Sequence, residues 1–147
     1  MSATYVPTIS SGTAGPLGVL HLPRLWQKLS LESQGKLAAG YPGMGRGYDA
    51  MTCAALGLDE AAVQSYVKTE KPTYTEFEAW VKKNASSLNK EAVDKHNAAV
   101  RGYNHDDDTR KEILGCCGLS DDASAPKDAV NLNNLDDWNG FHQAVLK

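Results

Sequence analysis

Short apolar segments with helical spacing recur along the chain, separated by glycine, proline and residues that cap helices. Leu22, Leu25, Trp26 and Leu29 show the spacing most clearly, because residues at i, i+3, i+4 and i+7 lie on one face of a helix. No convincing run of the polar–apolar alternation typical of strands is present. The pattern predicts an all-α fold, a compact bundle of six or seven short helices.

The expected helix boundaries follow from capping residues. The first helix should begin near Pro23, weaken near Gly35, and run to about Ala39, where Gly40 ends it. The later helices are expected to start at good N-cap residues or close to them: Asp49, Asp59, Thr75, Asn89, Asp108 and a position near Asn134. Thr75 and Glu78 have capping-box spacing. Glycines are expected to end three helices, namely Gly57, Gly102 and Gly118.

The domain organisation is read from composition and from weak internal similarity. Residues 1–18 are rich in Ser, Thr, Gly and Pro, and predict an extended N-terminal arm that lies on the domain or is loose in solvent. Residues 19–147 are expected to form a single helical domain. Its halves, 19–86 and 87–147, share short patterns such as GLDE and GLSD. Either a duplication or a common way of ending helices explains them.

Composition excludes several classes of protein. A hydrophobic content of 41% supports a packed core, and a net charge of −3 argues against general nucleic-acid binding. No apolar run is long enough to span a membrane, and the N-terminus lacks the pattern of a secretory signal. Three cysteines are too few for a disulfide framework, so reduced thiols in the cytoplasm are expected. We therefore expect neither nucleic acid nor membrane as a partner.

The glycine-rich stretch GYPGMGRGYD, residues 40–49, raises the question of a phosphate-binding loop. Gly43, Gly45 and Gly47 precede a predicted helix, where backbone N–H groups can bind anions, and Arg46 could pair with one. Nucleotide loops of the Rossmann and Walker types, however, follow a strand, and here a helix precedes the loop. The stretch is either a bend between helices or a contact for an anion.

Residues that could bind a ligand or take part in catalysis lie at the starts of two predicted helices. Asp49 and Cys53 are one turn apart on one helix, while His21 and Arg24 begin another. If these ends meet, the candidate ligand-binding residues are His21, Arg24, Gly45, Arg46, Gly47, Asp49 and Cys53. Histidine could then act as a base and cysteine as a nucleophile. Alternatively, Cys53 is an inert core side chain and Arg24 forms a structural ion pair with Asp49.

The remaining polar and aromatic residues favour structural roles. HDDD at 105–108 is interpreted as a solvated helix cap, and the adjacent Cys116 and Cys117, which lack zinc-site spacing, as buried thiols. No metal site or cofactor is predicted. His96 and His142 are expected to be packed and hydrogen-bonded. The aromatic residues expected to anchor the core are Trp26, Phe77, Trp80, Trp138 and Phe141.

Several of these motifs resemble one known family. They are GVLHLPRLWQKL at 18–29, GRGYDAMTCAALGLD at 45–59 and HNAAVRGYNHDDD at 96–108. The chain resembles a bacterial family known only as a domain of unknown function (five-zero-six-nine). The resemblance implies a small, soluble bacterial protein and brings no reaction with it.

Two functional hypotheses follow from the sequence. The leading one is a non-catalytic binding or protein-interaction module, whose protein or small-molecule partner the sequence does not identify. The alternative is an enzyme or small-anion-binding protein that uses the seven candidate residues. An enzyme requires those side chains to converge on an open pocket, whereas an interaction module should expose an apolar patch.

Overall fold

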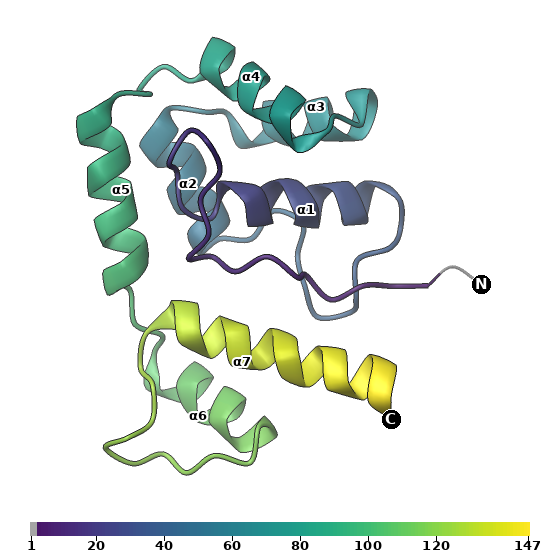
Figure 1. Cartoon of the computed structure of the whole chain (residues 1–147), viewed down its shortest axis with the longest axis vertical. Coiled ribbons are helices and arrows are strands. Elements are labelled where there is room, and N and C mark those ends of the chain that lie inside the picture. The colour runs from purple at the N-terminus through teal and green to yellow at the C-terminus, as the bar shows by residue number, and fades with distance from the viewer. Residues whose placement is uncertain (1–2) are drawn as a thin grey trace.

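The computed structural model describes residues 3–147, and all the regular secondary-structure elements in that range are helices (Figure 1). The α-helices are α1 (Leu22–Ser33), α2 (Tyr48–Leu56), α3 (Glu60–Glu70), α4 (Tyr74–Asn84), α5 (Lys90–Gly102), α6 (Asp107–Cys116) and α7 (Ala129–Phe141). A short π-helical segment, η1 (His142–Leu146), continues α7. The described residues contain isolated β-bridges but no strand. The predicted all-α bundle is therefore confirmed.

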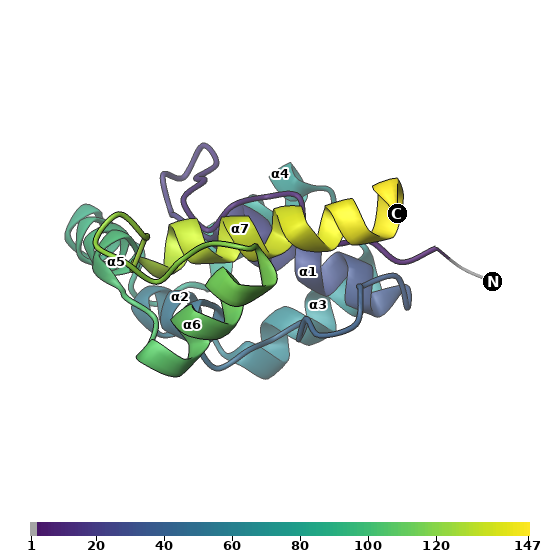
Figure 2. The same ribbon diagram turned by 90° about the horizontal axis from the view of Figure 1, so that it is seen from below.

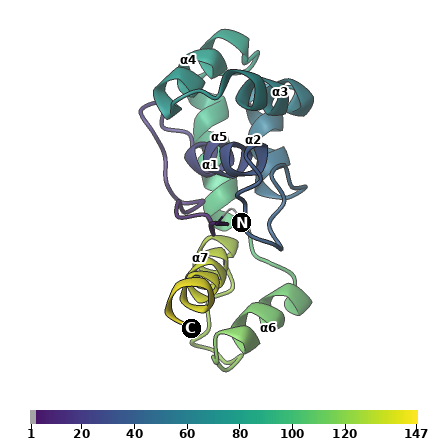
Figure 3. The ribbon, with the colours of Figure 1, turned by 90° about the vertical axis from the view of Figure 1, so that its right-hand side faces the viewer.

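The helices form two groups, which Figures 1 and 3 show one above the other. In the first group, α1 packs against α3 and α4, and α2 packs against α5. The second group is the pair α6 and α7, which contacts the first group partly through α5. The N-terminal segment runs between α1 and α7, as the view from below also shows (Figure 2). Three segments distant in sequence therefore meet along one seam.

Each group has its own core, and a smaller core joins them. The main core gathers side chains from α1 to α4 around Leu25 and Phe77, both fully buried. Ile113, Leu114 and Leu132 pack α6 against α7. The joining core consists of Leu20, Tyr48, Val100 and Ala129, which come from four different parts of the chain. Burial of these side chains holds the two groups together, since apolar burial is the dominant favourable term in folding.

Of the two alternatives for residues 1–18, the described residues 3–18 lie on the domain. The backbone of Tyr5 pairs with the segment after α1, accepting from Ala38 N at 3.0 Å and donating to Lys36 O at 2.7 Å. The side-chain oxygen of Gln27 on α1 accepts from the N–H groups of Thr8 and Ile9. Residues 1 and 2 of the predicted arm lie outside the described residues.

The end of the first helix differs from the prediction. α1 stops at Ser33 and does not continue to Ala39. Gly35 adopts a left-handed conformation with φ of 65°, and the N–H of Lys36 donates to Leu31 O at 2.8 Å. This is the hydrogen-bond pattern of a Schellman ending, so the glycine expected only to weaken the helix in fact ends it.

Several capping predictions are confirmed and others are displaced by a few residues. Asp59 and Asn89 cap α3 and α5 as predicted. The capping box of α4 is formed by Thr73 and Glu76, not by Thr75 and Glu78. Asp106, not Asp108, caps α6, and α7 begins five residues before Asn134 with Asp128 as its cap. Where neighbouring residues can all cap, the choice falls to whichever starts the helix in register with the core.

The aromatic predictions divide in the same way. Phe77 is a core residue as predicted, and Trp26 and Trp80 are half-buried against the main core. Trp138 and Phe141 are 63% and 50% exposed, so their prediction as core anchors is wrong. Of the two histidines predicted to be packed, His96 is buried and its Nε2 donates to Leu20 O, whereas His142 is exposed. The final turns of α7 pass beyond the end of α6 (Figure 1).

Candidate ligand-binding site

His21 lies immediately before α1 in an unusual backbone conformation. Its φ of 73° is uncommon for a residue other than glycine, although histidine adopts this region more often than most residues do. Both ring nitrogens are engaged: Nδ1 lies 2.9 Å from Ser11 Oγ, and Nε2 lies 2.6 Å from Asp49 Oδ1. The side chain thus connects the N-terminal segment to α2, and these contacts hold the strained backbone in place.

Asp49 lies in the first turn of α2, but it does not cap the helix as predicted. Its second oxygen, Oδ2, accepts from Lys28 Nζ at 2.5 Å and from the N–H of Gly45 at 2.7 Å. Burial alone raises the pKa of Asp49, but the hydrogen bond from His21 and the charge and hydrogen bond of Lys28 outweigh it and lower the pKa to about 2. Asp49 is therefore ionised at neutral pH and fully engaged by its neighbours.

Arg24 has a different partner from the one predicted. Its guanidinium makes a bidentate pair with Asp137 of α7, with NH1–Oδ2 and NH2–Oδ1 distances of 2.6 and 3.1 Å. NH1 also donates to Ile9 O, and the hydroxyl of Tyr41 donates to Asp137 Oδ1 at 3.0 Å. The predicted pair of Arg24 with Asp49 is not formed. This second network ties α1 to α7 across the seam.

Ser11, His21 and Asp49 have the residue types of a hydrolytic triad, but their arrangement differs from one. In that template the carboxylate contacts Nδ1 and the serine contacts Nε2, whereas here the two contacts are exchanged. Ser11 is only 1% exposed, so its hydroxyl is closed to a substrate. Burial lowers the pKa of His21, despite the opposing effect of Asp49. The imidazole is therefore neutral, donating to Asp49 and accepting from Ser11, and serves to join segments.

Cys53 does not lie with the other candidates. It is 1% exposed and belongs to the main core. Burial, followed by nearby carboxylates, raises its pKa to about 12. Since the thiolate is the reactive form, this thiol is inert at neutral pH. Its position matches the alternative interpretation of Cys53 as a small core side chain.

Six of the seven candidates line one cavity of about 270 Å³ between the two helix groups: His21, Arg24, Gly45, Arg46, Gly47 and Asp49. The lining also contains Lys28, Tyr41, Asp136 and Asp137, which sequence reasoning missed. Lys28 could have been found, because it lies one turn after Arg24 on α1. Asp137 could not, because it is 113 residues from Arg24.

The glycine loop contacts carboxylates of the protein itself. The N–H of Gly43 donates to Glu32 Oε2 at 2.9 Å, and that of Gly45 donates to Asp49. A Cβ at Gly43 would overlap the Glu32 carboxylate, so a larger residue there would displace that side chain and its hydrogen bond to the loop. Arg46, between Gly45 and Gly47, is exposed at the edge of the cavity. Within residues 3–147 no carboxylate forms an ion pair with it.

The other titratable clusters give no site. Among residues 3–147 no group of three or more His, Cys, Asp and Glu side chains is arranged to hold a metal ion. In HDDD, Asp106 caps α6 as part of the solvated helix start, and His105 contacts Asn133 at 2.8 Å. All three cysteines are free, but Cys116 is exposed, so its prediction as a buried thiol is wrong.

Fold and cavity together define a small all-α protein with a polar cavity between two helix groups. The chain belongs to the family described as a domain of unknown function (DUF5069), whose sequence profile matches residues 9–136. A comparison with curated proteins found no match. In the part of the chain described by the structure, no helix is long and apolar enough to cross a membrane.

Proposed function

We propose that this protein is a non-catalytic binding module that takes a small acidic ligand, a carboxylate or phosphate, in the cavity between the helix groups. The supporting observation is the charge distribution of the lining. Arg24 and Lys28 are each paired with a buried carboxylate, whereas Arg46 lies at the rim with no such partner among the described residues; the exposed carboxylate of Asp136 also lines the cavity. An acidic group that enters the cavity can pair with Arg46 without breaking either buried pair.

The same geometry argues against catalysis. A nucleophile must reach its substrate and a base must be free to accept a proton. Ser11 is closed off, Cys53 lies in the core, and the imidazole of His21 has both nitrogens engaged. The buried ion pairs therefore hold the walls of the cavity in place. A ligand would contact the exposed residues at its rim.

A second candidate function is protein interaction. Four large apolar side chains are exposed near the end of α7 and in η1, namely Trp138, Phe141, Val145 and Leu146. Contiguous apolar surface of this kind marks protein interfaces. For both candidate functions we propose a cytoplasmic location, which the three free cysteines support.

Ligand-induced stabilisation tests the binding function. Thermal unfolding should be followed with inorganic phosphate and with mono- and dicarboxylates at about 1–20 mM, where a ligand at 100 times its Kd adds about 2.7 kcal/mol. That stabilisation corresponds to a rise in Tm of roughly 5–10 °C for a chain of this size. Arg46→Gln should abolish the rise, because it removes the rim cation. Arg24 is a poor probe, since removing its charge also breaks the buried pair with Asp137.

Arg101→Gln is the matched control, because Arg101 is an exposed arginine on α5 that does not line the cavity. It should retain the full stabilisation. The proposal would be contradicted if none of these anions stabilises the wild type. It would also be contradicted if Arg46→Gln responds like the wild type, which would indicate binding elsewhere.

A further inference from the structure

The charged side chains that line the cavity between the helix groups do not all have partners. Apart from the histidines, three are basic and three are acidic, namely Arg24, Lys28 and Arg46, and Asp49, Asp136 and Asp137. Arg24 pairs with Asp137, and Lys28 pairs with Asp49. Within residues 3–147, Arg46 and Asp136 form no ion pair, either with each other or with another residue. The buried pairs thus leave one exposed cation and one exposed carboxylate on the same cavity.

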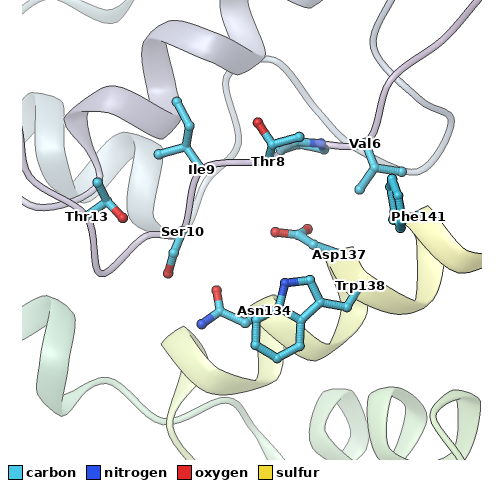
Figure 4. Close-up of a pocket in the computed structure, with 10 residues that line it drawn as sticks. Val6, Thr8, Ile9, Ser10, Thr13, Asn134, Asp137, Trp138 and Phe141 are labelled. Carbon is cyan, nitrogen blue, oxygen red and sulfur yellow. The ribbon is translucent and has the colours of Figure 1, made fainter.

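The two adjacent aspartates of α7 differ in their surroundings. The carboxylate of Asp137 points from α7 toward the N-terminal segment (Figure 4), and Arg24 neutralises it. Asp136 has no paired cation among the described residues, and partial burial, followed by the charge of Asp137, raises its pKa. The ionised form of Asp136 therefore lacks a counter-charge, which a cationic group of a ligand would supply.

The rest of the lining also offers sites for both signs of charge. Asn133, one turn before Asp136 on α7, presents an amide oxygen that already contacts His105. The ring of Tyr103, which is 44% exposed, packs edge-on against His105 with ring centroids 6.2 Å apart. The face of a tyrosine ring attracts cations. Arg46, in contrast, immediately precedes the start of α2, where the helix dipole favours an anion. One part of the lining therefore suits a cation and another part suits an anion.

We propose, on the basis of the binding function above, that the ligand is a small zwitterion, an amino acid whose carboxylate contacts Arg46 and whose ammonium group contacts Asp136. A plain acid brings its negative charge into the cavity that Asp136 also lines, and like charges in one site oppose binding. An ammonium group removes that repulsion and adds a second charge-assisted hydrogen bond. The cavity volume of about 270 Å³ is below the ~300–1,000 Å³ of pockets for drug-sized ligands, which favours a small molecule.

Matched pairs of probe molecules test this ligand class. NMR titrations at neutral pH should compare glycine with acetate, β-alanine with propionate, and γ-aminobutyrate with butyrate, because the members of each pair differ only by the amino group. The amide signals of Gly45 and Gly47 report on the cavity, since both residues line it. The amino acid whose length best matches the separation of Arg46 and Asp136 should bind roughly tenfold tighter than its partner acid, the effect of one added hydrogen bond between charged groups.

Two variants separate the contributions of the two charges. Asp136→Asn should remove the preference for the amino acid and strengthen the binding of the plain acid, because it removes the like charge. Arg46→Gln should abolish the binding of both. Asp108→Asn is the matched control, because Asp108 is an exposed aspartate on α6 that does not line the cavity. It should keep the preference of the wild type.

The outcomes distinguish the zwitterion from the broader binding function. Equal affinities within every pair of probes overturn the zwitterion, as does a preference that survives Asp136→Asn or disappears in Asp108→Asn. If only plain acids or inorganic phosphate bind through Arg46, the zwitterion is wrong but the binding function stands. If none of these molecules binds, both are wrong. All three variants alter exposed side chains, so unchanged amide signals outside the cavity should confirm that each remains folded.

Discussion

Removing the carboxylate of Asp137 should cost the protein a large part of its folding free energy. Asp137 and Arg24 are each 6% exposed at the side chain and meet through two hydrogen bonds of 2.6 and 3.1 Å. Asp137→Leu keeps a side chain of similar size but leaves the guanidinium buried, with Ile9 O as its remaining hydrogen-bond acceptor among the described residues. The substitution therefore tests whether the pair that joins α1 and α7 is needed for folding.

The expected magnitude follows from burial. Breaking a buried ion pair by removing one partner costs about 3–5 kcal/mol, because the other charge is left without compensation. Domains are typically stable by about 5–15 kcal/mol, so this is a substantial fraction. At roughly 2–4 °C per kcal/mol for a chain of this length, Tm should fall by about 6–20 °C. The double variant Arg24→Met with Asp137→Leu should recover most of the loss, since it leaves no buried charge.

Urea denaturation followed by circular dichroism measures these differences for the wild type, both single variants and the double variant. Asp94→Ala is the control, because it breaks the fully exposed pair with Lys90 and should leave the transition where it is. The reasoning would be refuted if Asp137→Leu shifts the free energy by less than about 0.5 kcal/mol, the usual range for surface substitutions. A double variant as unstable as the single variants would also refute it.

Three further predictions concern pH, thiol reactivity and capping. Burial lowers the pKa of His21 and of His96 below 6.5, so stability is full above that pH and falls as the pH decreases, by up to about 1.4 kcal/mol per pH unit for each histidine. Urea midpoints measured between about pH 5 and pH 7.5 give this dependence of stability on pH. Stability that does not change with pH would contradict the prediction, and His96→Gln should make the dependence weaker. Because burial raises the pKa of Cys53 to about 12, a thiol reagent should label it only in urea, and native labelling of all three cysteines would contradict its burial. Thr73→Ala should lower the free energy of unfolding by about 1 kcal/mol, because it removes the N-cap of α4, whereas Thr75→Ala should lower it much less. Equal losses would contradict Thr73 as the cap.

Much of the secondary structure could be predicted because its causes are local. Helices begin at Asp59 and Asn89, and one ends at Gly57, through hydrogen bonds to residues within one turn. These roles can therefore be read from the sequence. Choices between adjacent equivalents could not be predicted. Thr73 and Thr75 can both cap, and burial of Phe77 and Glu78 decides which register forms.

The candidate site shows the same division. Spacing along α1 indicates that His21, Arg24 and Lys28 share a face, and the glycine loop leads directly into α2. That six candidates line one cavity was therefore within reach of the sequence. Their partners were not: Arg24 pairs with a carboxylate from α7, and the paths of α6 and the loop before α7 determine that contact.

The sequence by itself determined that the chain is helical, where most helices begin, and which residues share a helical face. These properties depend on the periodicity of the backbone and on hydrogen bonds between neighbours. Only the tertiary structure decided that Arg24 meets Asp137, that Cys53 is separated from the cavity, and that Trp138 remains exposed. Those facts depend on how distant helices pack. Since an apolar helical stripe looks the same whether or not another element covers it, its burial cannot be read from the stripe alone.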